Sequence, residues 1–132
     1  MKDMTRLPTS AEWEFAAKGG ANPTGDFTFA GSNNANDVAW HNANSGMTRE
    51  VGLLQANCLG IHDMSGNVFE WVWDWWENYT SESTDPGSPI GSARVARGGS
   101  WLVAASNSRS VHQGYAGPGF RNGAIGFRLA RP

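Results

Sequence analysis

The feature that most constrains the fold is an alternation of side chains over residues 69–75, FEWVWDW. Phe and Trp occupy every second position, and Glu70, Val72 and Asp74 lie between them. Successive side chains of a β-strand point to opposite faces of a sheet, so a period of two predicts a strand rather than a helix. We therefore expect residues 69–75 to form a strand with one aromatic face, in a fold built around an aromatic core.

A second segment carries the start and stop signals of a helix. Thr9 and Glu12 form a capping box, in which each side chain accepts a hydrogen bond from the backbone N–H of the other residue. Gly19 and Gly20 follow as a C-terminal stop, because glycine readily adopts the left-handed conformation that ends many helices. The pattern predicts a short helix over residues 10–18.

The remaining chain reads as short strands separated by loops. Residues 95–101 and 125–130 have the apolar and β-branched character of two further strands. Residues 27–29 and 38–40 are short apolar pieces that form either strands or anchors of a loop. The rest of 21–60 and the Ser-, Pro- and Gly-containing stretch 77–92 are predicted loops.

Composition fits one loop-rich globular domain over residues 1–132. Gly accounts for 17 of 132 residues, against a usual share of about 7%, and there are seven Trp. The single Cys58 excludes an internal disulfide and a site built from several thiolates. No apolar run approaches the roughly 18 residues that span a bilayer, and the first ten residues do not resemble a signal peptide. These features give no prediction of a cellular location.

Charge is divided unevenly along the chain. Residues 1–85 carry twelve acids and four bases, whereas residues 86–132 carry six Arg and no acid. A basic half is one signature of nucleic-acid binding. Here the Arg are dispersed and no Lys accompanies them, so we expect an acidic half folded against a basic half and no nucleic-acid partner.

Four motifs in order resemble the formylglycine-generating enzyme, or sulfatase-modifying factor, family. They are RLPTSAEWEFAA at 6–17, GIHDMSGNVFEW at 60–71, RGGSW at 97–101 and GFRLA at 126–130. The resemblance implies an α+β fold of the C-type lectin type, loop-rich, with small antiparallel sheets and short helices. Members of the family usually have a further segment before the first motif, so the resemblance also implies a minimal or truncated version of the fold.

The oxidase chemistry of that family is not expected in this chain. The generating enzymes resemble it through the GGS motif and then use two cysteines, five residues apart, to bind copper and activate oxygen. Aligned on residues 98–100, those positions fall at about Val103 and Ser108. Neither side chain supplies the thiolate that a copper(I) site and a cysteine nucleophile need. We therefore predict a protein that is not an enzyme and binds no copper.

Residues 97–130 are more specifically similar to the variable region of proteins diversified by a retroelement, whose reverse transcriptase miscopies template adenines. In such proteins a C-type lectin fold displays the diversified residues as a ligand-binding face. The spacing places positions of the fixed type at Trp101, Ala105, Arg109, Pro118, Arg121 and Ile125. It places diversified, ligand-binding positions at Leu102, Val103, Ala104, Asn107, His112, Gly114, Tyr115, Ala116, Gly117, Phe120, Asn122, Gly123 and Ala124.

The genetic code offers a test of that spacing. An Asn codon randomised at its two adenines cannot encode Trp, Gln, Glu, Lys or Met, and none of the thirteen positions holds one of these. Tyr and Phe would provide large contact area with few rotatable bonds, as they do in antibody loops. The alternative interpretation is an ordinary Gly-rich surface loop with anchoring aromatics.

A calcium site of the generating enzymes is similar to residues Asp63, Gly66, Val68 and Glu70. The resemblance implies that the two carboxylates and the carbonyls of Gly66 and Val68 hold one Ca²⁺, an ion that prefers oxygen ligands. In the alternative interpretation, Asp63 caps a tight turn and Glu70 pairs with an arginine, Arg97 or Arg128. The two interpretations stay open at the level of sequence.

The leading hypothesis is a non-enzymatic ligand-binding module that presents a hypervariable surface to a protein or another surface macromolecule. One alternative is an enzyme of the sulfatase-modifying family with a different chemistry. Another is a structural domain of a larger assembly.

Overall fold

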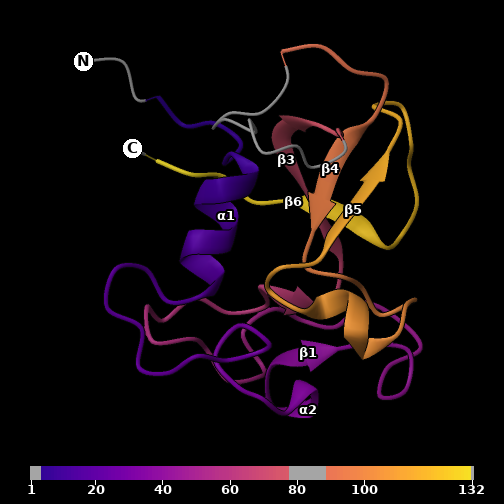
Figure 1. The fold of residues 1–132 in the computed structure, drawn as a ribbon. Helices are drawn as coiled ribbons and strands as arrows, with labels where there is room; N and C mark the ends of the chain where they lie inside the picture. Colours follow the sequence, from indigo (N-terminus) through magenta and orange to yellow (C-terminus); the bar gives the residue numbers. More distant parts are fainter. Residues whose placement is uncertain (1–3, 78–88, 132) are drawn as a thin grey trace.

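The computed structural model describes residues 4–77 and 89–131. Most of the loop predicted at 77–92 lies outside these residues. Figure 1 shows helix α1 beside a curled sheet of four strands, with β1, α2 and several loops gathered at the opposite end from the chain termini. The elements are α1 (Ser10–Ala17), α2 (Ala35–Val38), β1 (Ala39–Trp40), β2 (Ser65–Gly66), β3 (Phe69–Trp75), β4 (Arg94–Arg97), η1 (Ala105–Ser108), β5 (Gln113–Ala116) and β6 (Ile125–Phe127).

Helix α1 confirms the capping box read from the sequence. The backbone N–H of Glu12 donates to Oγ1 of Thr9 at 3.2 Å, and the N–H of Thr9 donates to Oε2 of Glu12 at 2.8 Å. Gly19 ends the helix with a φ of +99°, and a Cβ there would lie 2.5 Å from Sγ of Cys58. Glycine is therefore required at this position for both its backbone angle and its lack of a side chain.

The larger sheet has the strand order β5-β4-β3-β6. Strand β3 has the predicted bounds, whereas the strands predicted at 95–101 and 125–130 are shorter, as β4 and β6. β4 runs antiparallel to β3 and β5, while β6 runs parallel to β3. The α+β prediction is confirmed, and the sheet is mixed rather than antiparallel throughout.

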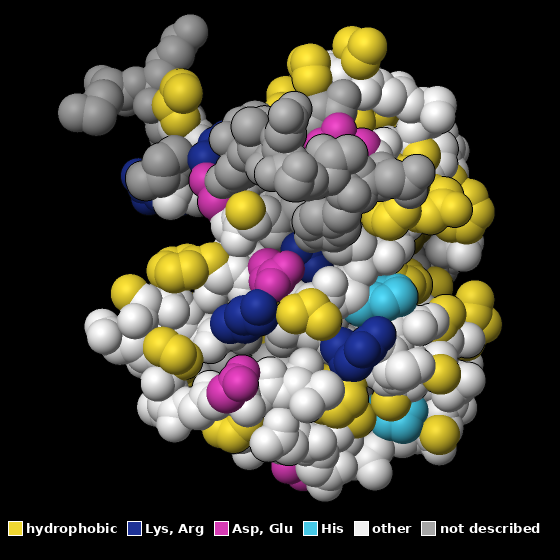
Figure 2. All heavy atoms as spheres, in the orientation of Figure 1, with side chains coloured by type: hydrophobic (Ala, Val, Ile, Leu, Met, Phe, Trp, Pro, Cys, Tyr) yellow, Lys and Arg dark blue, Asp and Glu magenta, His cyan; other side chains and the backbone are white. Residues whose placement is uncertain are grey.

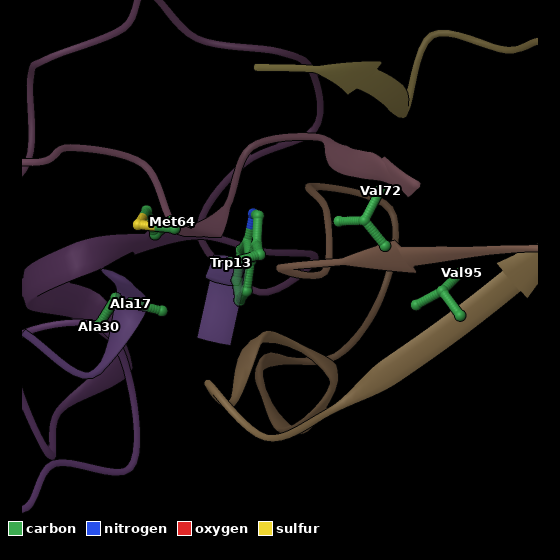
Figure 3. Packing of buried hydrophobic residues seen from close by; sticks show 6 residues of the cluster. All are labelled: Trp13, Ala17, Ala30, Met64, Val72 and Val95. Carbon is green, nitrogen blue, oxygen red and sulfur yellow. The ribbon is translucent and has the colours of Figure 1, made fainter. Parts of the chain in front are cut away.

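The buried face of β3 is the opposite of the one expected. Val72 is 1% exposed and packs in a core with Trp13, Ala17, Ala30, Met64 and Val95 (Figure 3). Trp73, on the other face, is 54% exposed. The prediction of an aromatic core is therefore wrong for this strand, because its aromatic side chains lie on the face of the sheet that points away from α1.

Two acidic side chains lie on the buried face beside Val72, because each of them accepts hydrogen bonds from nearby donors. Glu70 accepts from Nε1 of Trp13 at 2.7 Å and from the guanidinium of Arg128. Asp74 accepts from the backbone N–H of Ser10 at 2.6 Å, at the first turn of α1. Burying a carboxylate is costly unless it is paired or hydrogen-bonded, and these contacts meet that condition. They also fasten α1 to the sheet.

The second, smaller sheet pairs β1 with β2 in parallel. It requires glycine at position 66, where φ is +75° and a Cβ would lie 2.4 Å from the carbonyl oxygen of Trp40. Of the two short apolar pieces, residues 38–40 contribute β1, and Phe29 forms an isolated bridge with Ser32. Among the described residues, no helix is both long and apolar enough to cross a bilayer.

Candidate functional site

The segment 102–124, which holds the thirteen candidate positions, is referred to below as the variable segment. It leaves β4 through Gly98, Gly99 and Ser100, forms η1 and β5, and returns to the sheet at β6. Gly99 has a φ of +71°, and a Cβ there would lie 2.4 Å from Oγ of Ser108. The turn before the variable segment thus brings η1 against the backbone of the sheet.

Main-chain atoms attach this segment to the rest of the molecule. The carbonyl of Val103 accepts from the N–H of Asn42 at 3.0 Å, and the carbonyl of Ala124 accepts from the N–H of Phe69 at 2.8 Å. The N–H of Ser110 donates to the carbonyl of Thr28 at 3.0 Å. The two carbonyl bonds form whatever side chain the attached residue carries, and the N–H bond forms with every residue except proline.

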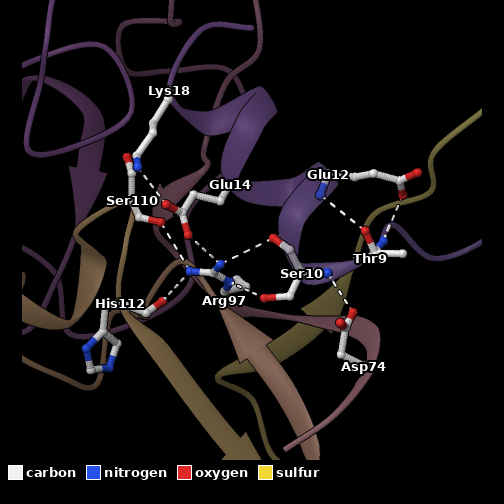
Figure 4. Close-up of polar contacts among 9 residues, drawn as sticks. All are labelled: Thr9, Ser10, Glu12, Glu14, Lys18, Asp74, Arg97, Ser110 and His112. Carbon is white, nitrogen blue, oxygen red and sulfur yellow. Dashed lines mark hydrogen bonds and ion pairs between the residues drawn. The ribbon is translucent and has the colours of Figure 1, made fainter. Parts of the chain in front are cut away.

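A buried arginine provides a further attachment (Figure 4). The guanidinium of Arg97, whose residue is 1% exposed, donates to the carbonyls of Ser110 at 3.2 Å and His112 at 3.0 Å. On its other side it donates to Ser10 and to Oε2 of Glu14, the latter at 2.7 Å. Arg97 therefore joins the variable segment to α1.

Most of the thirteen candidate side chains are accessible. Exposed positions are Leu102, Ala104, Tyr115, Gly117, Phe120, Asn122 and Gly123, and partly buried ones are Val103, Asn107, His112, Gly114 and Ala116. Ala124 is 4% exposed. The prediction that the side chain of Ala124 lies on a ligand-binding face is therefore wrong. The backbone of Ala124 is hydrogen-bonded to β3, and this contact buries the side chain.

The exposed members include large apolar groups. Leu102 is 55%, Tyr115 59% and Phe120 49% exposed. The ring of Tyr115 stacks on that of Trp76 with centroids 4.4 Å apart. Figure 2 shows hydrophobic side chains gathered along the right-hand edge, where Figure 1 places β5 and the loop after it. Such a surface offers contact area to a large partner.

Histidine 112 adds a polar group that is neutral at pH 7. Burial lowers the pKa of its imidazole, and the nearby positive charges of Arg109 and Arg97 lower it further. A neutral imidazole both donates and accepts a hydrogen bond.

The positions of the fixed type differ from one another in how far their side chains are buried. Arg109 braces the loop, since its Nε donates to the carbonyl of Ser106 at 2.8 Å. Trp101 is partly buried, and its Nε1 donates to the carbonyl of Gly123 at 3.1 Å. Phe127, in the GFRLA motif, is 65% exposed and therefore lies outside the core. It follows Gly126 on β6 and lies on the outward face of the sheet, opposite Trp71.

The two positions aligned with the copper cysteines occupy different environments. Val103 is partly buried, whereas Ser108 is fully buried at 0% exposure. Within the described residues, Oγ of Ser108 has no hydrogen-bond partner. A valine and a buried hydroxyl do not supply the ligands of the family's oxidase site.

Of the carboxylate oxygens in the four residues similar to a calcium site, some already accept hydrogen bonds and one has no partner in the described part of the chain. Oδ2 of Asp63 accepts from the N–H of Gly52 at 2.8 Å, while its buried Oδ1 has no partner among the described residues. Glu70 accepts from Arg128 at 2.6 and 2.7 Å, with Nη2 of Arg128 also reaching the carbonyl of Asp63 at 3.2 Å. These are the turn cap and ion pair of the alternative interpretation.

Asp63 and Glu70 both line a surface cavity of about 510 Å³, whose lining includes neither Gly66 in β2 nor the partly buried Val68. The orphaned Oδ1 of Asp63 fits calcium, whereas the positive charge of Arg128 already compensates Glu70. Counting His, Cys, Asp and Glu side chains, the described part of the chain contains no group of three or more that could hold a metal.

Sequence reasoning missed two contributors to this region. Glu14 lies 83 residues before Arg97, and nothing in either motif indicates that they pair. Trp76 ends an aromatic run, but its stacking partner lies in another strand. A distant pair of this kind leaves no periodic signal in one sequence.

Comparisons with known proteins agree with the resemblance read from the motifs. Residues 2–132 match the model of the FGE-sulfatase family, the sulfatase-modifying factor enzyme 1-like domain. A chaperone protein LppX of Paenibacillus barcinonensis is 38% identical over 83% of this chain and 42% of its own length. The formylglycine-generating enzyme of Thermomonospora curvata is 37% identical over 74% of this chain and 38% of its own length.

The fold has a solved counterpart in Treponema denticola variable protein 1. The two structures superpose with a TM-score of 0.88 at 41% identity, over 99% of this chain and 49% of the other. This chain spans less than half the length of each of these three proteins. The likeness confirms the fold class and the similarity to a variable protein, and the match over residues 2–132 shows that the chain belongs to the sulfatase-modifying factor enzyme 1-like domain family.

Proposed function

We propose that this domain is a non-enzymatic ligand-binding module whose variable segment presents a surface diversified by a retroelement. One observation carries the proposal: the segment is held by main-chain atoms and by Arg97, while twelve of the thirteen candidate side chains are at least partly exposed. Side chains that do not hold the fold are free to change. The likeness to Treponema denticola variable protein 1 supports the same conclusion.

The chemistry of the segment favours a macromolecular partner. Leu102, Tyr115 and Phe120 each expose about half of their surface or more, and glycines separate them. Aromatic side chains bury large areas at modest entropic cost, and they dominate many protein interfaces. The partner is a protein or another surface macromolecule.

The absence of enzymatic activity is part of the proposal. It rests on Val103 and Ser108 at the positions aligned with the cysteines of the generating enzymes. Relatives with that enzyme name match between 74% and 95% of this chain, and Treponema denticola variable protein 1 matches 99%, so the family alone does not assign a role.

We further propose that one Ca²⁺ binds at Asp63, with Glu70 and the carbonyls of Gly66 and Val68 as the remaining donors. The partnerless Oδ1 of Asp63 supports it. The ion would compensate the carboxylate of Asp63, since Arg128 already pairs with Glu70, and it would fix the turn before β3.

A library tests the display function directly. The twelve accessible candidate codons are randomised to NNY with Ala124 retained, and a control library randomises the buried residues Ala17, Met64, Val72 and Val95. We expect most variants of the first library to be soluble with cooperative melting, and most of the control library to be insoluble. If the twelve-position library is mainly insoluble, those residues support the fold and the display function is wrong.

The neighbouring DNA tests the origin of the diversity. The proposal expects a reverse-transcriptase gene nearby and a near-copy of codons 97–130 that differs mainly where the copy has adenine. A genome with neither feature would remove diversification by a retroelement while leaving the library experiment valid.

A further inference from the structure

Asn122 is the only asparagine of the chain that a glycine follows. Asn122 and Gly123 are both exposed and lie in the loop between β5 and β6, within the variable segment. The side-chain amide of an asparagine can react with the backbone nitrogen of the next residue, and glycine hinders this least because it has no side chain and adopts the widest range of backbone angles. A Cβ at Gly123 would meet nothing within 4 Å, so no neighbouring group crowds this residue.

The side-chain carbonyl of Asn122 has a hydrogen-bond donor in position. The backbone N–H of Ala124 donates to Oδ1 of Asn122 at 2.8 Å. Nucleophilic attack on Cγ places negative charge on this oxygen, and a donor that is already aimed at such an oxygen stabilises the charge, as in an oxyanion hole. Ala124 is 4% exposed and its carbonyl accepts from the N–H of Phe69 at 2.8 Å, so the sheet holds the donor in place.

The two nitrogens that would take part in the reaction have no competing contact. Within residues 4–77 and 89–131, neither Nδ2 of Asn122 nor the N–H of Gly123 forms a hydrogen bond. Asn57 shows the opposite arrangement, since it is 6% exposed and its Nδ2 donates to the carbonyl of Ala16 at 2.8 Å. The leaving group and the nucleophile at Asn122 are therefore both available for reaction.

We propose that Asn122 is a site of spontaneous modification, at which the chain converts its own side-chain amide into a carboxylate. The nitrogen of Gly123 loses its proton to solvent and attacks Cγ of Asn122. The bond from Cγ to Nδ2 breaks, and Nδ2 takes up a proton and leaves as ammonia. Water then opens the resulting succinimide ring at one of its two carbonyls, which gives aspartate or isoaspartate. The reaction needs water but no oxidant, reductant or enzyme.

The product changes the charge of the variable segment. Residues 102–124 contain no Asp or Glu, so the new carboxylate is the first acid in this segment, and it follows Arg121 directly in the sequence. The carboxyl group is ionised at neutral pH, because the ordinary pKa of an aspartate is about 3.9. In isoaspartate the main chain also gains one methylene before Gly123, whose carbonyl accepts from Nε1 of Trp101. The ligand-binding surface therefore changes as each molecule ages, a consequence that rests on the proposed function.

The experiment incubates the purified chain at mildly alkaline pH and follows its asparagine-containing peptides by mass spectrometry. An isoaspartate-specific methyltransferase identifies the rearranged product. We expect Asn122 to convert several-fold faster than Asn34. Gly123→Ala, which the open space around this residue tolerates, should slow the conversion of Asn122 to about the rate of Asn34.

Asn34 is the matched control because it has the same kind of hydrogen bond. Its Oδ1 accepts from the N–H of Asn36, two residues further on, at 3.2 Å. It is also exposed, but Ala35 follows it and its Nδ2 donates to Asp37 at 3.1 Å. The comparison therefore separates the glycine and the unbound amide nitrogen from the donor at Oδ1.

A second arm measures what the fold contributes. The same chain unfolded in urea keeps Asn122 and Gly123 but loses the ordered donor from Ala124, so we expect the native chain to convert at least as fast as the unfolded one. Slower conversion of the native chain overturns the proposal, because the fold then protects Asn122. A rate at Asn122 no greater than that at Asn34, or one that Gly123→Ala leaves unchanged, also overturns it. Failure of the display library leaves these measurements unaffected, since they use the wild-type surface and no ligand.

Discussion

The carboxylate of Glu14 lies 2.7 Å from Nη2 of Arg97, which joins α1 to β4 across 83 residues of sequence. Arg97 is 1% exposed and also donates to Ser10 and to the carbonyls that fix the variable segment. This contact therefore joins the helix, the sheet and the candidate binding face at one point.

Replacing Arg97 by Met should destabilise the domain strongly. The change leaves the carbonyls of Ser10, Ser110 and His112 without their Arg97 donor and leaves Glu14 with Lys18 alone. Breaking a buried ion pair on one side costs about 3–5 kcal/mol. Urea unfolding measures the loss. Arg6→Met is the control, because the Arg6–Glu12 pair is 39% and 41% exposed and such pairs contribute about 1 kcal/mol or less. Equal losses for the two variants would contradict the central role of Arg97.

Stability should fall in acid through the acids of α1. The hydrogen bond from Arg6 lowers the pKa of Glu12 to about 2 from 4.5. For Glu14, burial raises the pKa, but hydrogen bonds from Lys18 and Arg97 outweigh it and the net pKa is lowered. A lowered folded-state pKa stabilises above the unfolded value of 4.5, and that stability is lost as the pH falls through the folded value.

Melting temperatures measured from neutral pH down to pH of about 2 check this expectation. The Glu14→Gln variant should show a shallower acid dependence than the wild type, because it removes one of the titrating groups. A dependence of the same slope in both proteins would assign the acid sensitivity to other carboxylates. Glu12 should contribute modestly, since its side chain is 41% exposed and solvent screens the pair.

Truncating exposed groups of the variable segment should barely affect folding. Leu102→Ala and Phe120→Ala should each change the unfolding free energy by about 0.5 kcal/mol or less. Tyr115→Ala should cost more, about 0.5–1.5 kcal/mol, because the ring stacks on Trp76. Denaturant titrations separate these values. A large loss for Leu102→Ala would place that side chain in the structural framework.

Calcium should raise the melting temperature if it binds at Asp63. A ligand that binds only the folded state stabilises it by about 2.7 kcal/mol at one hundred times its Kd. Asp63→Gly, which removes the carboxylate and tolerates the φ of +58° at this residue, should abolish the calcium increment. Identical melting of the wild type in millimolar calcium and in chelator would favour the turn cap and ion pair alone.

The purified domain should not oxidise a cysteine-containing peptide in the presence of copper. Val103 and Ser108 lack the thiolates that would bind copper(I) and attack the substrate. Mass spectrometry of the peptide after incubation detects formylglycine directly, with a family member that has both cysteines as the positive control. Turnover by the wild-type chain would contradict the non-enzymatic proposal.

Local signals predicted much of the secondary structure. The capping box at Thr9 and Glu12 gives α1, and the alternation in residues 69–75 gives β3 with its observed bounds. Both signals depend on neighbours in sequence, so one chain suffices to read them. The diversified positions of the variable segment stay a prediction from motif spacing, and most of them are exposed.

The features of the fold that the sequence did not predict depend on contacts between residues far apart in the chain. Alternation shows that β3 has two different faces, but the buried one is chosen by Trp13, Ser10 and Arg128, which satisfy Glu70 and Asp74. Hydrophobicity alone favours the tryptophan face. The parallel pairing of β6 with β3 likewise leaves Phe127 outside the core, a result of topology rather than residue type.

Attachment through the main chain at Val103, Ser110 and Ala124 affects how such a domain can change over generations. Every residue has a backbone carbonyl and every residue except proline has an N–H, so most mutations within the segment leave these bonds intact. If the segment is diversified as proposed, a population of these chains would present many surfaces while most of its members still fold.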